Sequence, residues 1–127
     1  AAVRTALIRE VRQLRQAGHK VVLVQTVPSF RGEYAWEPER CSLVSTLRGC
    51  VQQMPLEAAN DRSAPVRQML TAVASASGAQ VVDPGPAVCR DGTCVTGDEA
   101  GPWYADESHL SVEGSLRLAP VFADLLD

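Results

Sequence analysis

The chain alternates between two hydrophobic periods, one typical of helices and one typical of strands. In the first part, apolar side chains recur every three or four positions among charged residues, and Gly18 ends the pattern. The apolar positions are Val3, Leu7, Ile8, Val11 and Leu14. This spacing predicts an amphipathic helix that stops near Gly18. The β-branched apolar run at 21–27, ended by Pro28, predicts a buried parallel strand.

The order of helix and strand occurs again further along the chain. The spacing predicts a helix that begins near Ser63 and Pro65 and ends at Gly78. Its apolar face consists of Val66, Met69, Leu70 and Val73. A second short parallel strand is predicted at 79–84, directly after the helix. The intervening segment 28–60 has no sustained period and reads as a long loop, with a possible short helix at 42–48.

A last helix is predicted after Ser111, where the helical period returns. Its apolar positions are Val112, Leu116, Ala119, Phe122 and Leu126. Pro120 is expected to kink it. The whole order is helix, strand, loop, helix, strand, hairpin, helix, which favours an α/β fold of three layers with helices on both faces of a parallel sheet. Because the chain opens on a helix that leads into a buried strand, we expect the preceding strand to lie outside these residues.

Composition fits one globular domain and argues against a nucleic-acid partner. Of the 127 residues, 46% are hydrophobic and 21% charged, which is ordinary for a single domain. The 12 basic and 15 acidic residues give a net charge of −3, and aromatic residues make up only 5%. With no basic run, nothing in the sequence would follow a phosphate backbone. The longest apolar run is too short to span a bilayer.

Four cysteines permit disulfides, metal ligation or buried thiols. Between Cys89 and Cys94, the Asp-Gly pair favours a two-residue turn that sets the two cysteines opposite each other, within reach of a disulfide. Cys41 and Cys50 could close a second small loop. Zinc is the rival interpretation, but neither spacing matches a common two-cysteine zinc motif. Two disulfides would place the protein in an oxidising compartment.

The candidate chemistry lies just before the last helix, where Asp106 precedes His109 by three residues. A histidine acting as a general base needs a carboxylate that holds its tautomer and stabilises the imidazolium. Such a pair on a tight turn could also be a surface histidine in a weak ion pair. The nucleophile is not obvious. Ser29 follows the strand end at Pro28 but lacks a glycine-flanked elbow. Ser108 and Ser111 lie beside His109 in sequence, but Ser111 fits better as a helix N-cap.

The segment from Val81 to Gly114 resembles the C-terminal end of an SGNH domain of the kind fused to membrane-bound acyltransferases of the acyltransferase-3 type. The resemblance is carried by Val81-Val82-Asp83-Pro84, by the two cysteines around the Asp-Gly turn, and by Trp103-Tyr104-Ala105-Asp106-Glu107-Ser108-His109-Leu110-Ser111-Val112-Glu113-Gly114. It implies an SGNH-hydrolase or flavodoxin-like fold, with His109 as catalytic base and Asp106 as its partner. Leu110, Ser111 and Gly114 belong to the signature as structural residues.

The resemblance also implies what the chain lacks. An SGNH domain carries its nucleophilic serine in a Gly-Asp-Ser block after its first strand, and the 127 residues contain no such block. We therefore interpret residues 1–127 as the C-terminal portion of one SGNH-like domain, with the serine upstream and no cofactor required. The loop aromatics Tyr34 and Trp36, with Arg31 and Glu33, could offer a surface for sugar rings.

The implied function is O-acyl transfer, commonly of acetyl groups, to a bacterial cell-surface glycan such as lipopolysaccharide. The implied partners are an acyl donor, the glycan acceptor and an N-terminal membrane acyltransferase domain, with the SGNH part outside the cytoplasmic membrane. Transfer to water instead of a sugar would make the protein an esterase. A non-catalytic, disulfide-stapled domain that binds glycans is the alternative from another class.

Overall fold

The computed structural model describes residues 1–40 and 50–125. The elements are α1 (Ala2–Gln16), β1 (Val22–Val24), η1 (Gly32–Tyr34), η2 (Pro38–Arg40), β2 (Gln53–Pro55), α2 (Leu56–Ser77), β3 (Gln80–Val82), η3 (Gly85–Ala87), β4 (Cys89–Arg90), β5 (Thr93–Val95), β6 (Gly97–Asp98), β7 (Gly101–Pro102), α3 (Val112–Arg117) and α4 (Ala119–Ala123). The strands form three small sheets, in which β1 pairs with β3, β5 lies between β2 and β4, and β6 pairs with β7. Helices combined with a parallel strand pair make this an α/β structure.

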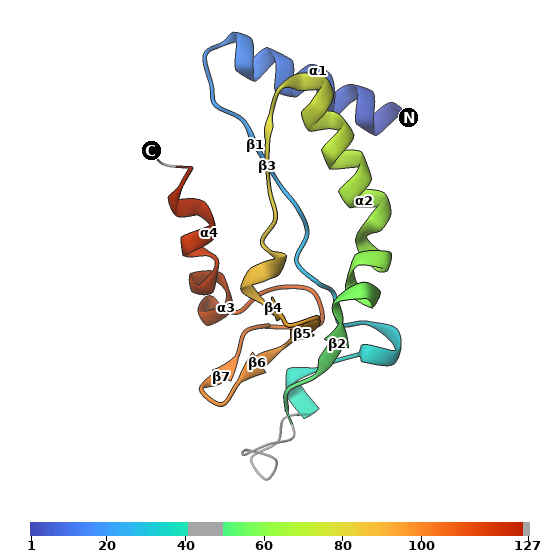
Figure 1. Ribbon diagram of the computed structural model, residues 1–127, viewed down its shortest axis with the longest axis vertical. Coiled ribbons are helices and arrows are strands. Elements are labelled where there is room, and N and C mark those ends of the chain that lie inside the picture. The colour runs from blue at the N-terminus through green and yellow to red at the C-terminus, as the bar shows by residue number, and fades with distance from the viewer. Residues whose placement is uncertain (41–49, 126–127) are drawn as a thin grey trace.

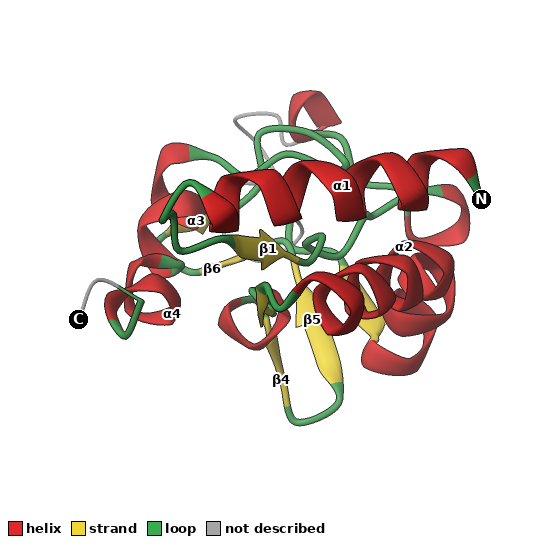
Figure 2. Ribbon diagram, turned by 90° about the horizontal axis from the view of Figure 1, so that it is seen from above, coloured by secondary structure: helices red, strands yellow, loops and turns green. Residues whose placement is uncertain are grey.

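The two parallel strands run through the middle of the molecule, and their carboxyl ends point toward the antiparallel sheets (Figure 1). α2 lies along one side of the strands, and α3 and α4 lie along the other. α1 crosses the opposite end and packs against α2 (Figure 2). The loops that follow β1 and β3 are therefore gathered at one end of the molecule, which is where sites form in such sheets.

Both predicted parallel strands are present and pair with each other in register, with Leu23 opposite Val81. The predicted burial of the first strand is wrong. Val24 is 44% exposed, and the other two residues of β1 are only half-buried. Within the described residues β1 has a single neighbour, so its other edge and part of its surface stay open. The three-layer arrangement around a larger parallel sheet remains a prediction.

The first helix forms where the period predicts, and Gly18 follows it with a positive φ of 91°. Only Val11 of its apolar face is buried, whereas Val3 is 69% exposed. The helix is attached to α2 at its polar positions, since Arg12 Nη2 donates to the carbonyl of Ala76 over 2.7 Å. The expected apolar docking of α1 is therefore only partly realised in the described residues.

The second helix begins at Leu56, well before the predicted start at Ser63, and Pro65 lies inside it. The segment 56–62 contains too few apolar residues to show a helical period. The tertiary structure starts the helix instead, because the Leu56 amide donates to the carbonyl of Gly92 over 2.9 Å and Ala59 is buried. The predicted long loop is correspondingly shorter.

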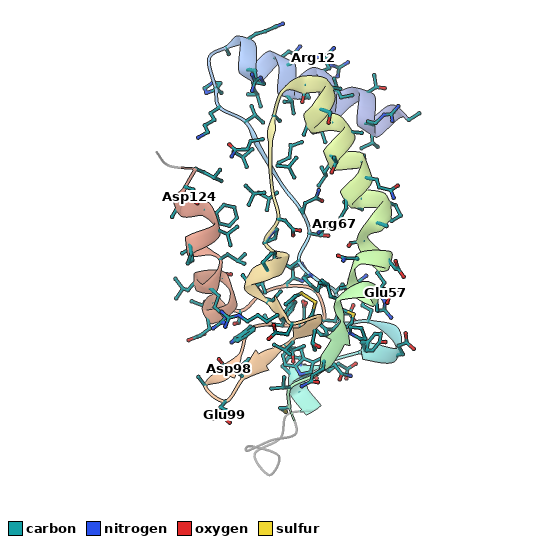
Figure 3. All side chains as sticks on the ribbon, in the orientation of Figure 1. Arg12, Glu57, Arg67, Asp98, Glu99 and Asp124 are labelled. Atoms are coloured by element: carbon teal, nitrogen blue, oxygen red, sulfur yellow. A yellow bond between two sulfur atoms is a disulfide. The ribbon has the colours of Figure 1, made fainter. Side chains whose placement is uncertain are left out.

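The Cys89–Cys94 hairpin forms as predicted. Asp91 and Gly92 both have positive φ, of 50° and 77°, the signs that a type I′ turn requires. The turn sets Cys89 opposite Cys94, with 3.9 Å between their Cα atoms, and a disulfide joins them (yellow bond in Figure 3). In this register both residues are part of the small antiparallel sheet, so the disulfide is a staple within the sheet.

Cys50 is also disulfide-bonded. Cys41, with which the sequence pairs it, lies outside the described residues, and the Cys41–Cys50 pairing stays a prediction. The short helix expected at 42–48 lies outside them too.

The last helix is split rather than kinked. α3 ends at Arg117 and α4 begins at Ala119, which places Pro120 in the first turn of α4, where its missing N–H costs nothing. Ser111 is the N-cap, as predicted, because its Oγ accepts from the Gly114 amide over 3.1 Å. The predicted apolar face is packed only in part: Val112 and Leu116 are 74% and 67% exposed, Phe122 is half-buried, and Leu126 lies outside the described residues.

The main core lies among the antiparallel sheets and the loops around them. Its buried members are Phe30, Trp36, Met54, Ala59, Val88, Cys89, Cys94, Trp103 and Tyr104. These residues come from segments far apart in the sequence. Trp103 and Tyr104 directly precede the candidate Asp106–His109 turn, and the half-buried Leu110, which follows it, packs against the cluster. The best-packed part of the molecule therefore supports that turn. Among the described residues, no helix combines the length and apolar character needed to cross a membrane.

Candidate functional site

Asp106 and His109 lie in a closed turn that is fixed at its base. Tyr104 and Leu110 form a single antiparallel bridge, and the Ala105 amide donates to the carbonyl of His109 over 2.8 Å. The chain therefore leaves and re-enters the core within a few residues. This geometry brings the two candidate side chains together, as their spacing predicts.

The Asp106 carboxylate organises the turn. Its Oδ1 accepts from the backbone amides of Ser108 and His109, at 2.8 and 2.7 Å. An aspartate that binds the amides two and three residues ahead in this way is a common turn device. The carboxylate also contacts the imidazole, with Nδ1 of His109 2.8 Å from Oδ2 and 3.0 Å from Oδ1. One side chain thus shapes the backbone and holds the histidine ring.

These hydrogen bonds lower the pKa of Asp106 from 3.8 to about 2, although its side chain is 52% exposed. The largest cause is the hydrogen bond from the Ser108 amide, followed by the bonds from the His109 ring and amide. Each of these donors stabilises the charged form. The carboxylate is therefore ionised at any pH at which His109 could act as a base.

The contact with Asp106 determines which nitrogen of His109 is available. A carboxylate on Nδ1 favours the tautomer with its proton there, which leaves Nε2 as the base. Nε2 makes no hydrogen bond to any described residue, and the His109 side chain is 78% exposed. The arrangement can accept a proton from a hydroxyl brought to Nε2 and stabilise the resulting imidazolium.

The segment that follows β1 contacts the Asp106–His109 turn and supports it. The Phe30 amide donates to the carbonyl of Glu107 over 2.7 Å, and the Tyr104 hydroxyl donates to the carbonyl of Pro28 over 2.9 Å. The rings of Phe30 and Tyr104 meet edge to face, with 5.1 Å between their centroids. Burial raises the pKa of Tyr104, so its hydroxyl remains a donor. The carboxyl end of β1 and the His109 turn are in this way joined.

Trp103 and the start of α3 support the turn from its other end. The Ser111 amide donates to the carbonyl of Trp103 over 2.9 Å, and Ser111 Oγ donates to that of Pro102 over the same distance. A Cβ added at Gly114 would lie 1.8 Å from the Trp103 carbonyl oxygen, so only glycine fits there. The structural role that the resemblance assigns to Ser111 and Gly114 is consistent with these contacts.

The Asp106–His109 pair lies in an open groove of about 540 Å³. The groove is lined by Arg31, Trp36, Glu37, Pro38, Glu39 and residues 105–109. The carboxylates outnumber the arginine in this lining, and Arg31 is paired with Glu107 at 2.9 Å. A substrate hydroxyl could reach His109 through this groove.

None of the serines considered as a nucleophile reaches Nε2 of His109. Ser29 Oγ donates to the carbonyl of Glu107 over 3.5 Å, and Ser111 caps α3. Ser108 Oγ lies 3.4 Å from the imidazole, but from Nδ1, the nitrogen that Asp106 occupies. Among the described residues, the structure thus brings a histidine and a carboxylate together without placing any of these serines at Nε2.

The proposed sugar-stacking surface is not formed by Trp36. Its side chain belongs to the core and is 6% exposed, with Nε1 donating to the carbonyl of Cys50 over 2.7 Å. Tyr34 is half-buried beneath the guanidinium of Arg62, 5.2 Å from the ring centroid. Apolar packing and a cation–π contact account for both rings. Among the described residues, no three side chains of His, Cys, Asp or Glu are grouped as a metal site.

A smaller cavity of about 200 Å³ lies at the carboxyl ends of β1 and β3, under the first turns of α2. None of its lining residues belongs to the His109 turn. Arg67, labelled in Figure 3, donates to Asp83 at its wall over 2.5 Å and lowers the pKa of that carboxyl. The Gly85 amide also donates a hydrogen bond to Asp83 and so fixes the turn after β3. The Arg67–Asp83 pair therefore has a structural explanation.

Arg31 contacts the His109 turn, and sequence reasoning did not connect the two. Its Nε lies 2.9 Å from Glu107 Oε1, and its Nη2 donates to Ser108 Oγ over 3.3 Å. The sequence places Arg31 in an aperiodic loop far from His109, and no local signal connects the two. Only the fold brings it beside the turn.

Comparison with known proteins identifies the family of this chain. The family model described as "SGNH domain (fused to AT3 domains)" matches residues 1–124, which is nearly the whole chain. No curated protein and no solved structure matched it. The match includes the Asp106–His109 turn, the hairpin and both parallel strands. The chain therefore belongs to the family of SGNH domains that are fused to acyltransferase-3 domains.

Proposed function

We propose that this chain supplies the acid–base half of an O-acyltransferase that modifies a bacterial cell-surface glycan such as lipopolysaccharide, with acetyl as the acyl group. The observation that carries the proposal is the His109 imidazole held through Nδ1 by Asp106, with Nε2 open to a groove. Family membership supports an acyltransferase or esterase role in general. The acceptor and the acyl group are our inference.

In this mechanism His109 removes a proton from a serine hydroxyl as that oxygen attacks the acyl ester. Asp106 stabilises the imidazolium, and the proton then passes from Nε2 to the leaving oxygen. In the second half-reaction the base activates the sugar hydroxyl, which takes the acyl group from the serine. Hydrogen-bond donors around the oxyanion are also needed, and we place them outside these residues together with the serine.

The proposal treats residues 1–127 as the C-terminal portion of one three-layer SGNH-like domain. Two features support this view: β1 has one strand neighbour among the described residues, and Val24 is 44% exposed on it. An additional parallel strand could pair with the open edge and carry a Gly-Asp-Ser block beside His109. Sequencing the coding DNA upstream of Ala1 tests this, because a start codon there without such a block would contradict it.

We place the domain outside the cytoplasmic membrane, tethered through an N-terminal membrane acyltransferase domain that delivers the acyl donor. The family description names such a fusion, and a disulfide across the hairpin suits an oxidising compartment. In material exported to that compartment, thiol titration under denaturing, non-reducing conditions should find few or no free thiols. Four free thiols would refute the placement.

The function is tested in the full-length protein by His109→Ala and Asp106→Asn, with base-released acetate from the surface glycan as the measurement. We expect each variant to lose at least about 100-fold in rate. His109→Ala removes the group that accepts the proton, and Asp106→Asn removes the carboxylate that stabilises the imidazolium. The matched control is His19→Ala, which removes the other histidine and should keep full activity.

The alternatives give different results in the same experiment. An esterase would release acetate from a donor ester in a His109-dependent way without acylating the glycan. A glycan-binding domain would bind the glycan equally well with and without His109 and would show no His109-dependent chemistry.

A further inference from the structure

The His109 imidazole has two possible acceptors for its Nδ1 proton. Asp106 is the nearer, at 2.8 Å, but Ser108 Oγ lies 3.4 Å from the same nitrogen. A hydroxyl oxygen has two lone pairs and rotates freely about its C–O bond, so Ser108 can accept that proton or donate its own to Nδ1. A serine proton donated to Nδ1 would favour the other tautomer, with the ring proton on Nε2. The state of this hydroxyl therefore affects how firmly the proton stays on Nδ1.

Arg31 determines the state of the Ser108 hydroxyl. Its Nη2 donates to Ser108 Oγ over 3.3 Å, while Ser108 Oγ lies 3.4 Å from Asp106 Oδ1. An oxygen that accepts a charge-assisted hydrogen bond is a weaker acceptor for a second donor and a stronger donor itself. The order Arg31, Ser108, Asp106 then directs the serine proton toward the carboxylate and away from the imidazole.

Arg31 is held by one contact of its guanidinium and by contacts of the backbone beside it. Its Nε is paired with Glu107 at 2.9 Å, and the Arg31 carbonyl accepts a hydrogen bond from Arg62 of α2 over 2.5 Å. The preceding residue, Phe30, is fully buried and bound to the Glu107 carbonyl. Arg31 is thus fixed by the same segment that supports the turn, even though its side chain is 61% exposed.

We infer that Arg31 is a positioning residue for His109: by donating to Ser108 it keeps the serine proton directed at Asp106 and away from Nδ1, so that the ring proton stays on Nδ1 and Nε2 is the free base. The inference rests on the proposed function for its catalytic consequence, whereas the tautomer itself is a property of the turn. Arg31 touches no reacting atom in this account, and its effect is transmitted through Ser108.

The test uses the protein labelled with ¹⁵N at histidine, with His109→Gln to identify the His109 signals. The ¹⁵N shifts of the ring report the ratio of the two neutral tautomers. In Arg31→Ala we expect this ratio to fall about three- to tenfold, the value of one hydrogen bond. In a Ser108→Ala background the same Arg31 change should have no effect, because the hydroxyl that could donate to Nδ1 is absent.

Two further variants separate the contacts of Arg31. Glu107→Gln removes the ion pair but keeps the Ser108 contact, and should keep the wild-type ratio. Arg31→Lys can still pair with Glu107 but lacks the fork that reaches both partners, so it should behave like Arg31→Ala. It also serves where the alanine variant does not fold. Arg9→Ala, which breaks an exposed pair with Glu10, is the control for loss of an arginine.

A tautomer ratio that is unchanged in Arg31→Ala and Arg31→Lys would overturn the inference. So would an effect of Arg31 that persists without Ser108. In the full-length protein, turnover should fall about tenfold in Arg31→Ala with little change in KM. If no His109-dependent acyl transfer is found at all, the proposed function fails, while the ratios still decide the role of Arg31.

Discussion

At the scale of single residues, Asp106 does more than pair with a histidine. Two of its hydrogen bonds come from the backbone of its own turn. Together with the hydrogen bond from the His109 ring, they lower the pKa of the Asp106 carboxyl. The carboxylate is therefore part of the structure that presents His109, so its loss would disturb both the charge and the geometry of the pair. This double role explains how an exposed pair can still be well ordered.

The first prediction concerns the pH dependence of this turn. Because the folded pKa of Asp106 is about 2, below the ordinary 3.8, its stabilising contribution is fully present above 3.8 and is lost as the pH falls through about 2. The amide proton shifts of Ser108 and His109 should therefore titrate with a midpoint near 2. In His109→Ala the midpoint should rise, and a wild-type midpoint near 4 would contradict the hydrogen-bonded turn.

The second prediction concerns the contact between α3 and Trp103, which lies in the segment that leads into the turn. Gly114→Ala places a methyl group 1.8 Å from the Trp103 carbonyl oxygen, and backbone must move to admit it. We expect a loss of about 3 kcal/mol in the free energy of unfolding, measured by denaturant titration. Ser115→Ala, one residue along on the exposed side, should change it by less than about 0.5 kcal/mol. Equal stability of the two variants would contradict the close approach.

At the scale of elements, the antiparallel hairpin connects the disulfide, the start of α2 and the core. Met54 of β2 lies opposite Cys94 in the sheet, and the Leu56 amide bonds the turn at Gly92. The hairpin therefore decides where α2 begins. The groove residues and the His109 turn are attached to the same core cluster, so the hairpin also supports the site indirectly.

The third prediction tests the hairpin staple. Replacing both Cys89 and Cys94 by alanine should lower the free energy of unfolding by about 2 kcal/mol, because the unfolded chain gains the freedom of a short loop. Asp91→Asn in the same turn should change it by less than about 0.5 kcal/mol, since asparagine also tolerates a positive φ. Thermal or denaturant unfolding measures both, and an unchanged double variant would mean that the disulfide contributes nothing.

At the scale of the whole molecule, tight packing and apolar exposure are unevenly distributed. The core lies at the end that carries the His109 turn, while the helices present exposed valines and leucines to solvent. The packing around the site consequently does not depend on the exposed apolar faces of the helices. The stability of the described structure should therefore depend on the core near the site much more than on the helical faces.

The fourth prediction follows from this distribution. Met54→Ala removes a fully buried side chain and should cost about 2–5 kcal/mol in the free energy of unfolding. Leu116→Ala alters a side chain that is 67% exposed and should cost less than about 0.5 kcal/mol. Denaturant titration of the two variants checks this, and similar costs would show that Leu116 is packed in solution.

The sequence alone determined the local features of this protein. The type I′ turn, the disulfide across it, the Ser111 cap and the pairing of Asp106 with His109 follow from residues within a few positions of one another, where backbone geometry leaves few choices. The parallel strands were also predictable from their β-branched runs. Family resemblance over the same residues supplied the family, which the family match confirms, and the role of the histidine remains a prediction.

The tertiary structure alone decided the features that depend on distant contacts. The early start of α2 depends on a hydrogen bond to the hairpin, and the burial of Trp36 depends on the core. Arg31 reaches Ser108 across 77 positions of sequence. The hydrophobic period indicates whether a residue lies in a helix or a strand, but it does not show which other elements cover that residue. The exposure of Val24 and Leu116 therefore could not be predicted from the sequence. The contacts within the Asp106–His109 turn therefore follow from the sequence, whereas the residues that surround the turn are brought there by the tertiary structure.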